Sequence, residues 1–308
     1  MKNILVLGGT GFLGQNLCET LEKENAGQLL KVSRRTGVDL SNLSSIRECL
    51  KAFQPDVIYN CAAHVGGIPY VVRLAADILR DNLQIGINLY EAVRIECPQA
   101  IIINPLSNCS YPGDANIHLE KDWLAGPVHD SVLSFANAKR IMYFLSECYK
   151  NQYGIKTKNF LVPNAFGPKD HTDPNRAHAL NGMIIRMILA KRRKDKTFEI
   201  WGSGNPLREW GYMKDIAKVL YLSLFIDKDL TYPVNIAQNK GYKIKESAQI
   251  LSELLHFEGD LVCNTKYKDG AEFKILDDVL FRSIFPSYSF SSHREGILET
   301  IKYYEEVL

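Results

Sequence analysis

Two patterns of apolar and polar positions alternate through the first half of the chain. Short segments have the length and apolar content of buried strands: 3–9, 29–35, 56–63, 100–107 and 157–164. Between them lie segments whose apolar positions recur at helical spacing: 12–24, 43–53, 73–95 and 135–152. Strands that alternate with helices in this way predict an α/β fold, a doubly wound parallel sheet of the Rossmann type.

The pattern changes after the last of these strands. Residues 167–178 are polar and rich in turn-forming residues, 178–193 have helical spacing, and 196–224 combine a strand, a turn and a helix. We therefore expect a Rossmann domain over 1–165. Residues 166–308 are expected to form mainly a smaller C-terminal lobe over the strand ends, with some segments returning to the first domain.

Composition and charge limit the class of protein. The 308 residues are 46% hydrophobic and 23% charged, and the net charge of +2 gives no reason to expect nucleic acid or an anionic membrane as a partner. No apolar run reaches the ~20 residues of a membrane span, and the first residues read as a strand rather than a signal peptide. Seven cysteines without a CxxC pair indicate the cytoplasm, with neither a disulfide framework nor a metal site.

A glycine-rich turn, "GGTGFLG", joins the first predicted strand to the first helix. The residues that we assign to a cofactor here are Gly8, Thr10, Gly11, Phe12, Leu13 and Gly14. In this pattern the first glycine makes a tight turn, the second lets the backbone approach a pyrophosphate, and the third lets helix and strand pack closely. The helix N-terminus also attracts phosphate charge. The loop predicts dinucleotide binding by residues 1–165, and the alternative is a turn without a ligand.

The end of the second strand indicates which dinucleotide this loop would bind. A carboxylate at this place would favour NAD, whereas the chain has Ser33, Arg34 and Arg35. Guanidinium groups suit a 2′-phosphate, so we predict NADP(H), the alternative being a solvated basic turn. Four further residues near the ends of the second and third strands are assigned to the same cofactor site: Asp39, Leu40, Ala62 and Ala63.

Six motifs extend this interpretation beyond the cofactor: "GGTGFLG", "VDL", "DVIYNCAAHVGGI", "PLSNCSYP", "FANAK" and "WGSGNPLREWGYMKDIA". Together they resemble the motifs of the extended short-chain dehydrogenase/reductases, and within these the GDP-L-fucose synthase branch. The resemblance extends from residue 3 to about residue 276. It implies an enzyme that inverts C3 and C5 of a GDP-4-keto-6-deoxyhexose, or of a related GDP-4-keto sugar, and then reduces C4 with NADPH.

The resemblance also implies catalytic roles for matching residues. Ser107 would bond the C4 oxygen of the sugar, and Lys139 would hold the nicotinamide ribose. Cys109 and His178 would be the acid and base of epimerisation, and His178 is also assigned to the cofactor site. A C4 ketone acidifies the protons on C3 and C5, and a thiol and an imidazole suit their transfer because both can titrate near neutrality.

The same resemblance makes the C-terminal lobe the substrate-binding part of the chain. Arg208 would meet the nucleotide phosphates, and Trp201 and Lys274 would line the nucleotide and sugar pocket. Asn164 would lie near the sugar and the diphosphate. The alternatives are an ion pair between Arg208 and the adjacent Glu209, and a purely structural role for Trp201 in the core.

One position departs from the pattern of the family. Where the family has a catalytic tyrosine four residues before Lys139, this chain has Phe135, which cannot donate a proton. Either an engineered replacement removed the tyrosine, or the natural protein lacks it and performs only proton chemistry as an epimerase. The retention of Ser107 and Lys139 favours the replacement. A third alternative, a non-catalytic protein that binds NADP(H), would have no use for Cys109 or His178.

The resemblance finally implies a homodimer. The predicted helices over 73–95 and 135–152 carry many apolar positions, and in this family the two helices pair across a two-fold axis. A stripe that a monomer would expose would then be buried between two copies.

Overall fold

The computed structural model describes residues 1–115, 117–227, 230 and 232–308. Its centre is a six-stranded parallel sheet in the order β10-β5-β4-β3-β1-β2. The strands are β1 (Asn3–Leu7), β2 (Gln28–Val32), β3 (Val57–Asn60), β4 (Ile101–Ser107), β5 (Thr157–Val162) and β10 (Val234–Asn235). The predicted doubly wound parallel sheet is confirmed, and its strand order reverses beside β1, where such folds bind their ligands.

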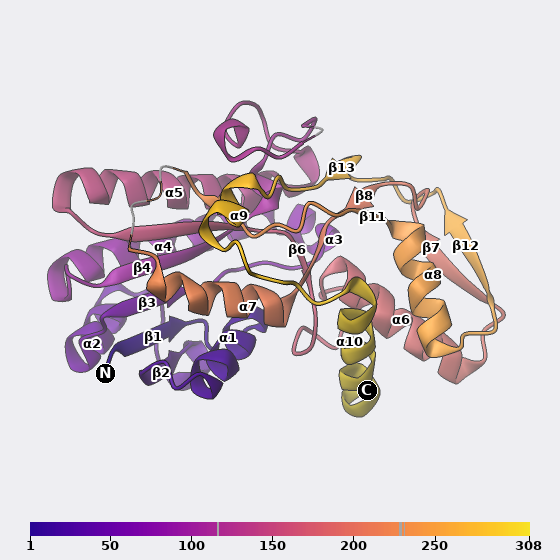
Figure 1. The fold of residues 1–308 in the computed structure, drawn as a ribbon, viewed down its shortest axis with the longest axis horizontal. Coiled ribbons are helices and arrows are strands. Elements are labelled where there is room, and N and C mark those ends of the chain that lie inside the picture. Colours follow the sequence, from indigo (N-terminus) through magenta and orange to yellow (C-terminus); the bar gives the residue numbers. More distant parts are fainter. Residues whose placement is uncertain (116, 228–229, 231) are drawn as a thin grey trace.

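Helices cover both faces of the sheet (Figure 1). On one face lie α2 (Leu43–Phe53), α4 (Ala75–Glu96) and α5 (Leu133–Tyr153), and on the other lie α1 (Phe12–Lys23), α7 (Met213–Leu222) and α9 (Val279–Ile284). Side chains of β1 alternate between the two cores: Leu5 and Leu7 join the first, whereas Ile4 and Val6 join the second. Burial on both faces explains why this strand is continuously apolar from Ile4 to Leu7.

A second part of the chain lies beyond the carboxyl ends of the strands, on the right of Figure 1. Its helices are α6 (Ala179–Arg193), α8 (Ile244–Leu255) and α10 (His293–Val307), which share one apolar core. Its short strands are β6 (Asn164–Phe166), β7 (Thr197–Trp201), β8 (Leu207–Arg208), β9 (Trp210–Tyr212), β11 (Tyr242–Lys243), β12 (Asp260–Asn264) and β13 (Phe273–Lys274). They form three small sheets, β11-β8-β13, β12-β7 and β6-β9.

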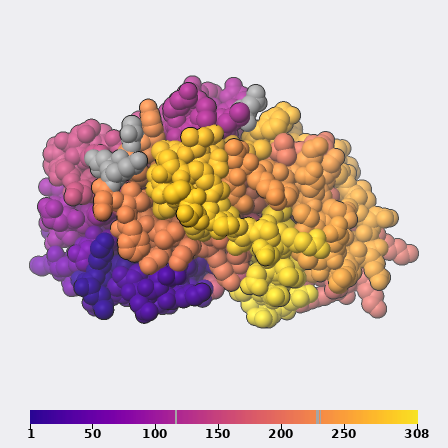
Figure 2. All heavy atoms as spheres, viewed as in Figure 1, coloured from indigo at the N-terminus to yellow at the C-terminus, as the bar shows by residue number. Residues whose placement is uncertain are grey.

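The chain crosses between the two parts several times. β10 pairs with β5 in the central sheet, and α7 and α9 pack on that sheet, although all three follow residue 166 in sequence. Figure 2 shows the C-terminal residues, in yellow, across the middle of one face, between the N-terminal helices and the orange lobe. Among the described residues, no helix is both long enough and apolar enough to cross a membrane.

Several predicted boundaries were wrong by a few residues. The strand expected over 29–35 ends at Val32, because Ser33 begins a short 3₁₀ turn closed by Thr36. The helix expected over 73–95 begins at Ala75, and Leu74 separates it from a short helix, α3 (Ile68–Arg73). The strand expected over 157–164 is divided at Pro163, whose ring nitrogen has no hydrogen to donate.

Candidate active site

The glycine loop is packed too closely to accommodate side chains. Gly8 has φ +75°, in the left-handed region, and its N–H donates to the Val32 carbonyl at 2.8 Å. A Cβ on Gly8 would lie 2.7 Å from the Ala62 Cα, and one on Gly14 would lie 2.1 Å from the Gly8 carbonyl oxygen. No described side chain caps the first N–H groups of α1, which begins at Phe12. This close backbone and the uncapped helix N-terminus fit a dinucleotide pyrophosphate.

Two exposed arginines follow the strand that supports this loop. The Ser33 N–H donates to the Thr36 hydroxyl at 2.8 Å, and this bond fixes the turn after Val32. Arg34 and Arg35 lie within the turn and are exposed to solvent. Because the Val32 carbonyl accepts from the glycine loop, the two guanidinium groups lie on the segment that adjoins it.

The other four predicted cofactor residues differ in their surroundings. The Asp39 carboxylate accepts from the Ser41 N–H at 3.0 Å and the Ser41 hydroxyl at 2.7 Å, and these bonds lower the pKa of Asp39. Leu40 is only 5% exposed and belongs to the core of the sheet. Ala62 contacts Gly8, and Ala63 follows it as a half-buried residue. Of these four residues, Ala62 is therefore the one that lies directly against the glycine loop.

At the end of β4, a serine and a cysteine form one unit. The Cys109 N–H donates to the Ser107 hydroxyl oxygen at 3.2 Å, at the start of a short 3₁₀ turn. The Cys109 sulfur accepts from the Lys274 ammonium at 3.5 Å. A thiol on the Rossmann sheet thus meets a cation from the C-terminal lobe, beside a hydroxyl group.

Phe135 and Lys139 share one face of α5. The Lys139 ammonium lies 5.5 Å from the centroid of the Phe135 ring and donates to the Pro105 carbonyl at 2.9 Å. Lys139 is 8% exposed, and burial lowers its pKa to about 8. An ammonium has three N–H donors, so the bond to Pro105 leaves donors for the hydroxyl groups of a ligand.

His178 lies at the N-terminus of α6 and is fixed by a carboxylate. Its Nδ1 lies 3.0 Å from Asp170 Oδ2, which also accepts from Asn181 Nδ2 at 2.9 Å. Burial alone would raise the pKa of Asp170, but the charge and hydrogen bonds of His178 lower it to about 2. Burial would lower the pKa of His178, and Asp170 outweighs this effect and raises it. The His178 ring also lies 5.1 Å from the ring of Phe12 in the glycine loop.

Two cations lie side by side in the lobe. Arg208 on β8 and Lys274 on β13 are paired in register, and Arg208 Nη1 donates to the Leu207 carbonyl at 2.8 Å. Burial lowers the pKa of Arg208. Burial, together with the charges of Lys274 and Arg208, lowers the pKa of His118 to about 4. Together these groups make a positive site of the kind that binds phosphates.

The alternative ion pair between Arg208 and Glu209 is not found among the described residues. The Glu209 carboxylate instead accepts from the Gln238 N–H at 2.6 Å and the Leu276 N–H at 2.8 Å. Burial raises the pKa of Glu209 to about 7. The Asn164 amide donates to the Glu209 carbonyl at 3.3 Å, which holds β6 beside this junction.

Trp201 is 36% exposed and belongs to an aromatic stack rather than to the core. Its ring lies 5.0 Å from the Tyr267 ring at 21°, and the Arg186 guanidinium lies 4.1 Å from it. Arg186 is held by the Glu199 carbonyl at 2.8 Å, and burial lowers its pKa to about 10. Such a platform suits the flat base of a nucleotide.

Two residues of this region were missed in the sequence analysis. Arg186 could have been found, because it is a lone charge within the apolar run "MIIRMILA". His118 gave no local signal, because a bridge to Leu276, far away in sequence, brings it beside the two cations.

The site combines a dinucleotide-type loop, a lysine on α5 and a cysteine at a strand end. These features together are typical of a dinucleotide-binding α/β enzyme, and comparisons with known proteins agree with this class. Residues 4–236 match the NAD dependent epimerase/dehydratase family, so the chain belongs to that family. A probable GDP-L-fucose synthase from Drosophila melanogaster is 29% identical over 318 residues, covering 99% of this chain and 98% of the relative. The GDP-L-colitose synthase of Yersinia pseudotuberculosis is 26% identical over 303 residues, covering 98% of this chain and 97% of the relative.

A solved structure agrees over nearly the same length. The crystal structure of a GDP-L-fucose synthetase from Naegleria fowleri bound to NADP superposes with a TM-score of 0.89 at 25% identity. The match covers 98% of this chain and 92% of that one. The resemblance to the GDP-L-fucose synthase branch inferred from the motifs is therefore confirmed.

Proposed function

We propose that this protein is a cytoplasmic, NADP(H)-dependent epimerase/reductase of a GDP-4-keto-6-deoxyhexose or a related GDP-4-keto sugar. The observation that carries the proposal is the contact of Cys109 with Lys274, which lies in register with Arg208. A thiol able to move a sugar proton and two cations able to hold a diphosphate then face one substrate. The named activities of the two relatives support a GDP-linked sugar, and seven free cysteines support a reducing compartment.

The cofactor would lie along the carboxyl ends of the central strands. NADPH bound there supplies the hydride for reduction. The glycine loop would hold its pyrophosphate, and Arg34 and Arg35 its 2′-phosphate. Lys139 would orient the nicotinamide ribose through its buried ammonium. NADP in the Naegleria structure supports this choice over NAD.

Epimerisation would be the work of Cys109 and His178. The Ser107 hydroxyl would bond the C4 oxygen, which draws electrons from the neighbouring carbons and acidifies their protons. One of the pair would remove a proton from C3 or C5, and the other would return one to the opposite face. Because Asp170 holds His178 through Nδ1, the ring retains Nε2 for this transfer.

Binding of the nucleotide is proposed for the lobe. Arg208 and Lys274 would hold the diphosphate, and Trp201, with Arg186, would stack on the base. Asn164 lies at the junction between the sheet and these groups, near the proposed place of the sugar.

A second candidate function follows from Phe135. Its ring occupies the place beside Lys139 but has no hydroxyl to protonate the C4 oxygen. If phenylalanine is natural there, the chain would be an epimerase without reductase activity, and if it is an engineered replacement, reduction would be slowed. A non-catalytic NADP(H)-binding protein would not need Ser107, Cys109 and His178 together.

The test is incubation with NADPH and GDP-4-keto-6-deoxymannose, followed by mass spectrometry and NMR of the sugar nucleotide. The epimerase/reductase should consume one NADPH for each product and give a sugar that has gained a hydride and a proton. A product of unchanged mass with inverted C3 or C5 would identify the epimerase. Binding without any change in the sugar would identify the non-catalytic alternative.

We also propose that two copies pair through α4 and α5. These helices pack side by side and leave several large apolar side chains exposed, among them Ile87 at 48%, Ile141 at 36% and Phe144 at 49%. A second copy of the same helices would cover this surface about a two-fold axis. Light scattering at micromolar concentration should give the mass of a dimer, and a monomer mass would contradict the proposal.

A further inference from the structure

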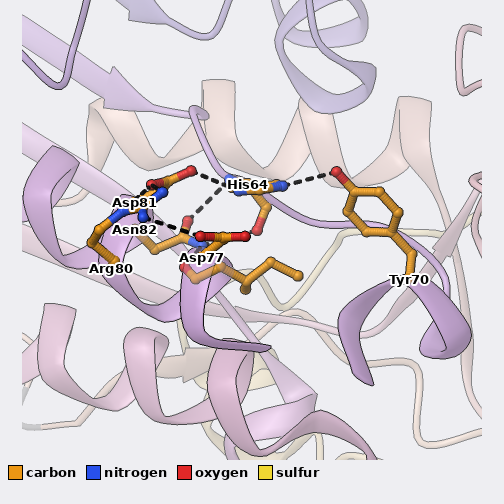
Figure 3. A network of polar contacts seen from close by, with 7 residues as sticks. His64, Tyr70, Asp77, Arg80, Asp81 and Asn82 are labelled. Carbon is orange, nitrogen blue, oxygen red and sulfur yellow. Dashed lines mark hydrogen bonds and ion pairs between the residues drawn. The ribbon is translucent and has the colours of Figure 1, made fainter. Parts of the chain in front are cut away.

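A polar network with no role so far lies between β3 and α4. Figure 3 shows His64 between the Asp81 carboxylate and the Tyr70 hydroxyl. His64 Nδ1 lies 2.8 Å from Asp81 Oδ2, and Nε2 lies 2.8 Å from the Tyr70 oxygen. The Asn82 side chain accepts from the His64 N–H at 3.1 Å and donates to its carbonyl at 2.9 Å. Both ring nitrogens of His64 are therefore engaged, and the imidazole connects a carboxylate with a phenol.

The segment that carries this network extends from the cofactor loop to the substrate lobe. At one end, a Cβ on Gly8 would lie 2.7 Å from the Ala62 Cα. At the other end, the Ile68 side chain and Arg208 Nη2 lie 4.0 and 3.4 Å from the position of a Cβ on Gly270. His64 and Tyr70 thus belong to a stretch of chain that borders both proposed ligands.

Tyr70 itself lies between the elements that carry Phe135 and His178. Helix α3, which contains Tyr70, packs against α5 and against the short turn that precedes α5. On another side, the Arg176 guanidinium lies 5.8 Å from the centroid of the Tyr70 ring. Arg176 is two residues before His178 in the loop that leads to α6. The fold therefore places a hydrogen-bonded phenol beside the helix whose phenylalanine replaces the tyrosine of the family.

We propose that the Tyr70 hydroxyl, supported by His64 and Asp81, donates the proton to the C4 oxygen of the sugar, in place of the phenol that Phe135 lacks. This inference rests on the proposed function. As C4 accepts a hydride from a reduced nicotinamide, the carbonyl π bond breaks and its electron pair passes to the oxygen. That oxygen takes the Tyr70 proton, and the resulting phenolate, held by the contact of its oxygen with His64 Nε2, takes a proton from water after the product leaves.

Asp81 would keep the imidazole in the orientation that this transfer needs. It accepts from the Nδ1 of His64 and is itself bonded to Arg80 at 2.8 Å. The side chains of His64 and Asp81 are 21% and 30% exposed, so water reaches this network. Tyr70 is thus the proposed catalytic residue, and His64 and Asp81 are positioning residues that orient its hydroxyl.

The test is a double-mutant cycle between Tyr70 and Phe135. With the 4-keto sugar saturating, Tyr70→Phe should slow NADPH oxidation by ~10² or more, since a positioned acid contributes ~10²–10⁴ in rate. In the Phe135→Tyr background the same change should alter the rate by less than about threefold, because the new phenol supplies the proton. His64→Asn and Asp81→Asn should follow the same pattern, which provides the test if Tyr70→Phe does not fold.

Two readouts besides reduction separate this inference from the proposed function. NADPH affinity measured by fluorescence and deuterium uptake at C3 and C5 should stay within about twofold in Tyr70→Phe, because neither needs this proton. Tyr153→Phe, which removes a phenol from the exposed far end of α5, is the matched control and should change nothing. Unchanged oxidation in Tyr70→Phe, or equal losses in both backgrounds, would overturn the inference while the function stands. Absence of deuterium uptake and of oxidation in every version, Phe135→Tyr included, would overturn both.

Discussion

The Lys274 ammonium donates a hydrogen bond to the Cys109 sulfur at 3.5 Å, although the two residues are 165 positions apart in sequence. Cys109 follows a strand of the central sheet, whereas Lys274 lies on a strand of the lobe. This contact joins the proposed place of proton transfer to the proposed place of the diphosphate.

The paired cations should dominate the affinity for the nucleotide. Charge-assisted hydrogen bonds contribute roughly 1.5–3 kcal/mol each, so Arg208→Met and Lys274→Met should each weaken GDP binding by roughly 10- to 150-fold. Isothermal titration calorimetry with GDP measures this effect. Arg193→Met is the matched control, because Arg193 is exposed and paired with Asp195 at 2.6 Å. Equal loss in the control, or none in either variant, would place the diphosphate elsewhere.

Cofactor preference should depend on the turn after β2. Replacing both Arg34 and Arg35 by serine should remove a preference for NADPH over NADH of about tenfold or more, because the 2′-phosphate would lose its cations. NADH affinity should change little. Fluorescence titration with both cofactors checks this, with Lys23→Ser/Lys51→Ser as a control that removes the same charge. If the variant without both arginines still prefers NADPH over NADH, another group binds the 2′-phosphate.

The buried ammonium of Lys139 should lower the free energy of unfolding of the protein. Its pKa of about 8 in the folded state lies below the ordinary value of 10.5, so the unfolded chain binds more protons between these values. The cost is fully present below pH 8, and the free energy of unfolding should rise as the pH increases from 8 toward 10.5. Lys139→Met should therefore raise this free energy by about 1–2 kcal/mol at pH 7, after the lost bond to Pro105 is counted. Urea unfolding measures it, and a less stable variant would contradict the account.

The carboxylate of Asp170 should set the pH at which His178 titrates. Asp170 raises the pKa of His178, so the imidazolium persists to a higher pH than usual. In Asp170→Asn this pKa should fall, because an adjacent opposite charge is lost. The corresponding limb in the pH profile of deuterium uptake should move to lower pH. The control is Asp173→Asn, which changes a carboxylate of the same loop that accepts from the Asn175 N–H rather than from His178, and it should leave the limb in place.

The central sheet could be predicted because its signals are local. Continuous burial makes β1 apolar from Ile4 to Leu7, and the spacing of leucines in α1 follows from a single buried face. The glycine loop was predictable for the same reason, because the strand, the turn and the helix are consecutive. The boundaries failed at Ser33 and Leu74, where side-chain capping and a break between helices, rather than hydrophobic spacing, set the ends.

Much of the candidate site could not be predicted, because it depends on contacts between distant segments. His118 joins the cations only through the bridge to Leu276. The network of His64, Tyr70 and Asp81 needs a loop to turn back onto α4. The hydrophobic periodicity of a sequence does not indicate contacts between distant segments. Resemblance to a family supplied the roles of matching residues, but not those at positions where this chain differs.

Deuterium uptake by a GDP-4-keto-6-deoxy sugar in D₂O, followed beside NADPH oxidation, tests the central claim most directly. The account predicts uptake at C3 and C5 in this chain and in its Phe135→Tyr version, because Cys109 and His178 do not depend on that hydroxyl. Cys109→Ser and His178→Asn should each lower uptake by ~10²-fold or more, while GDP affinity stays nearly unchanged. Uptake that persists in both variants, or is absent from the chain and its Phe135→Tyr version alike, would contradict the account.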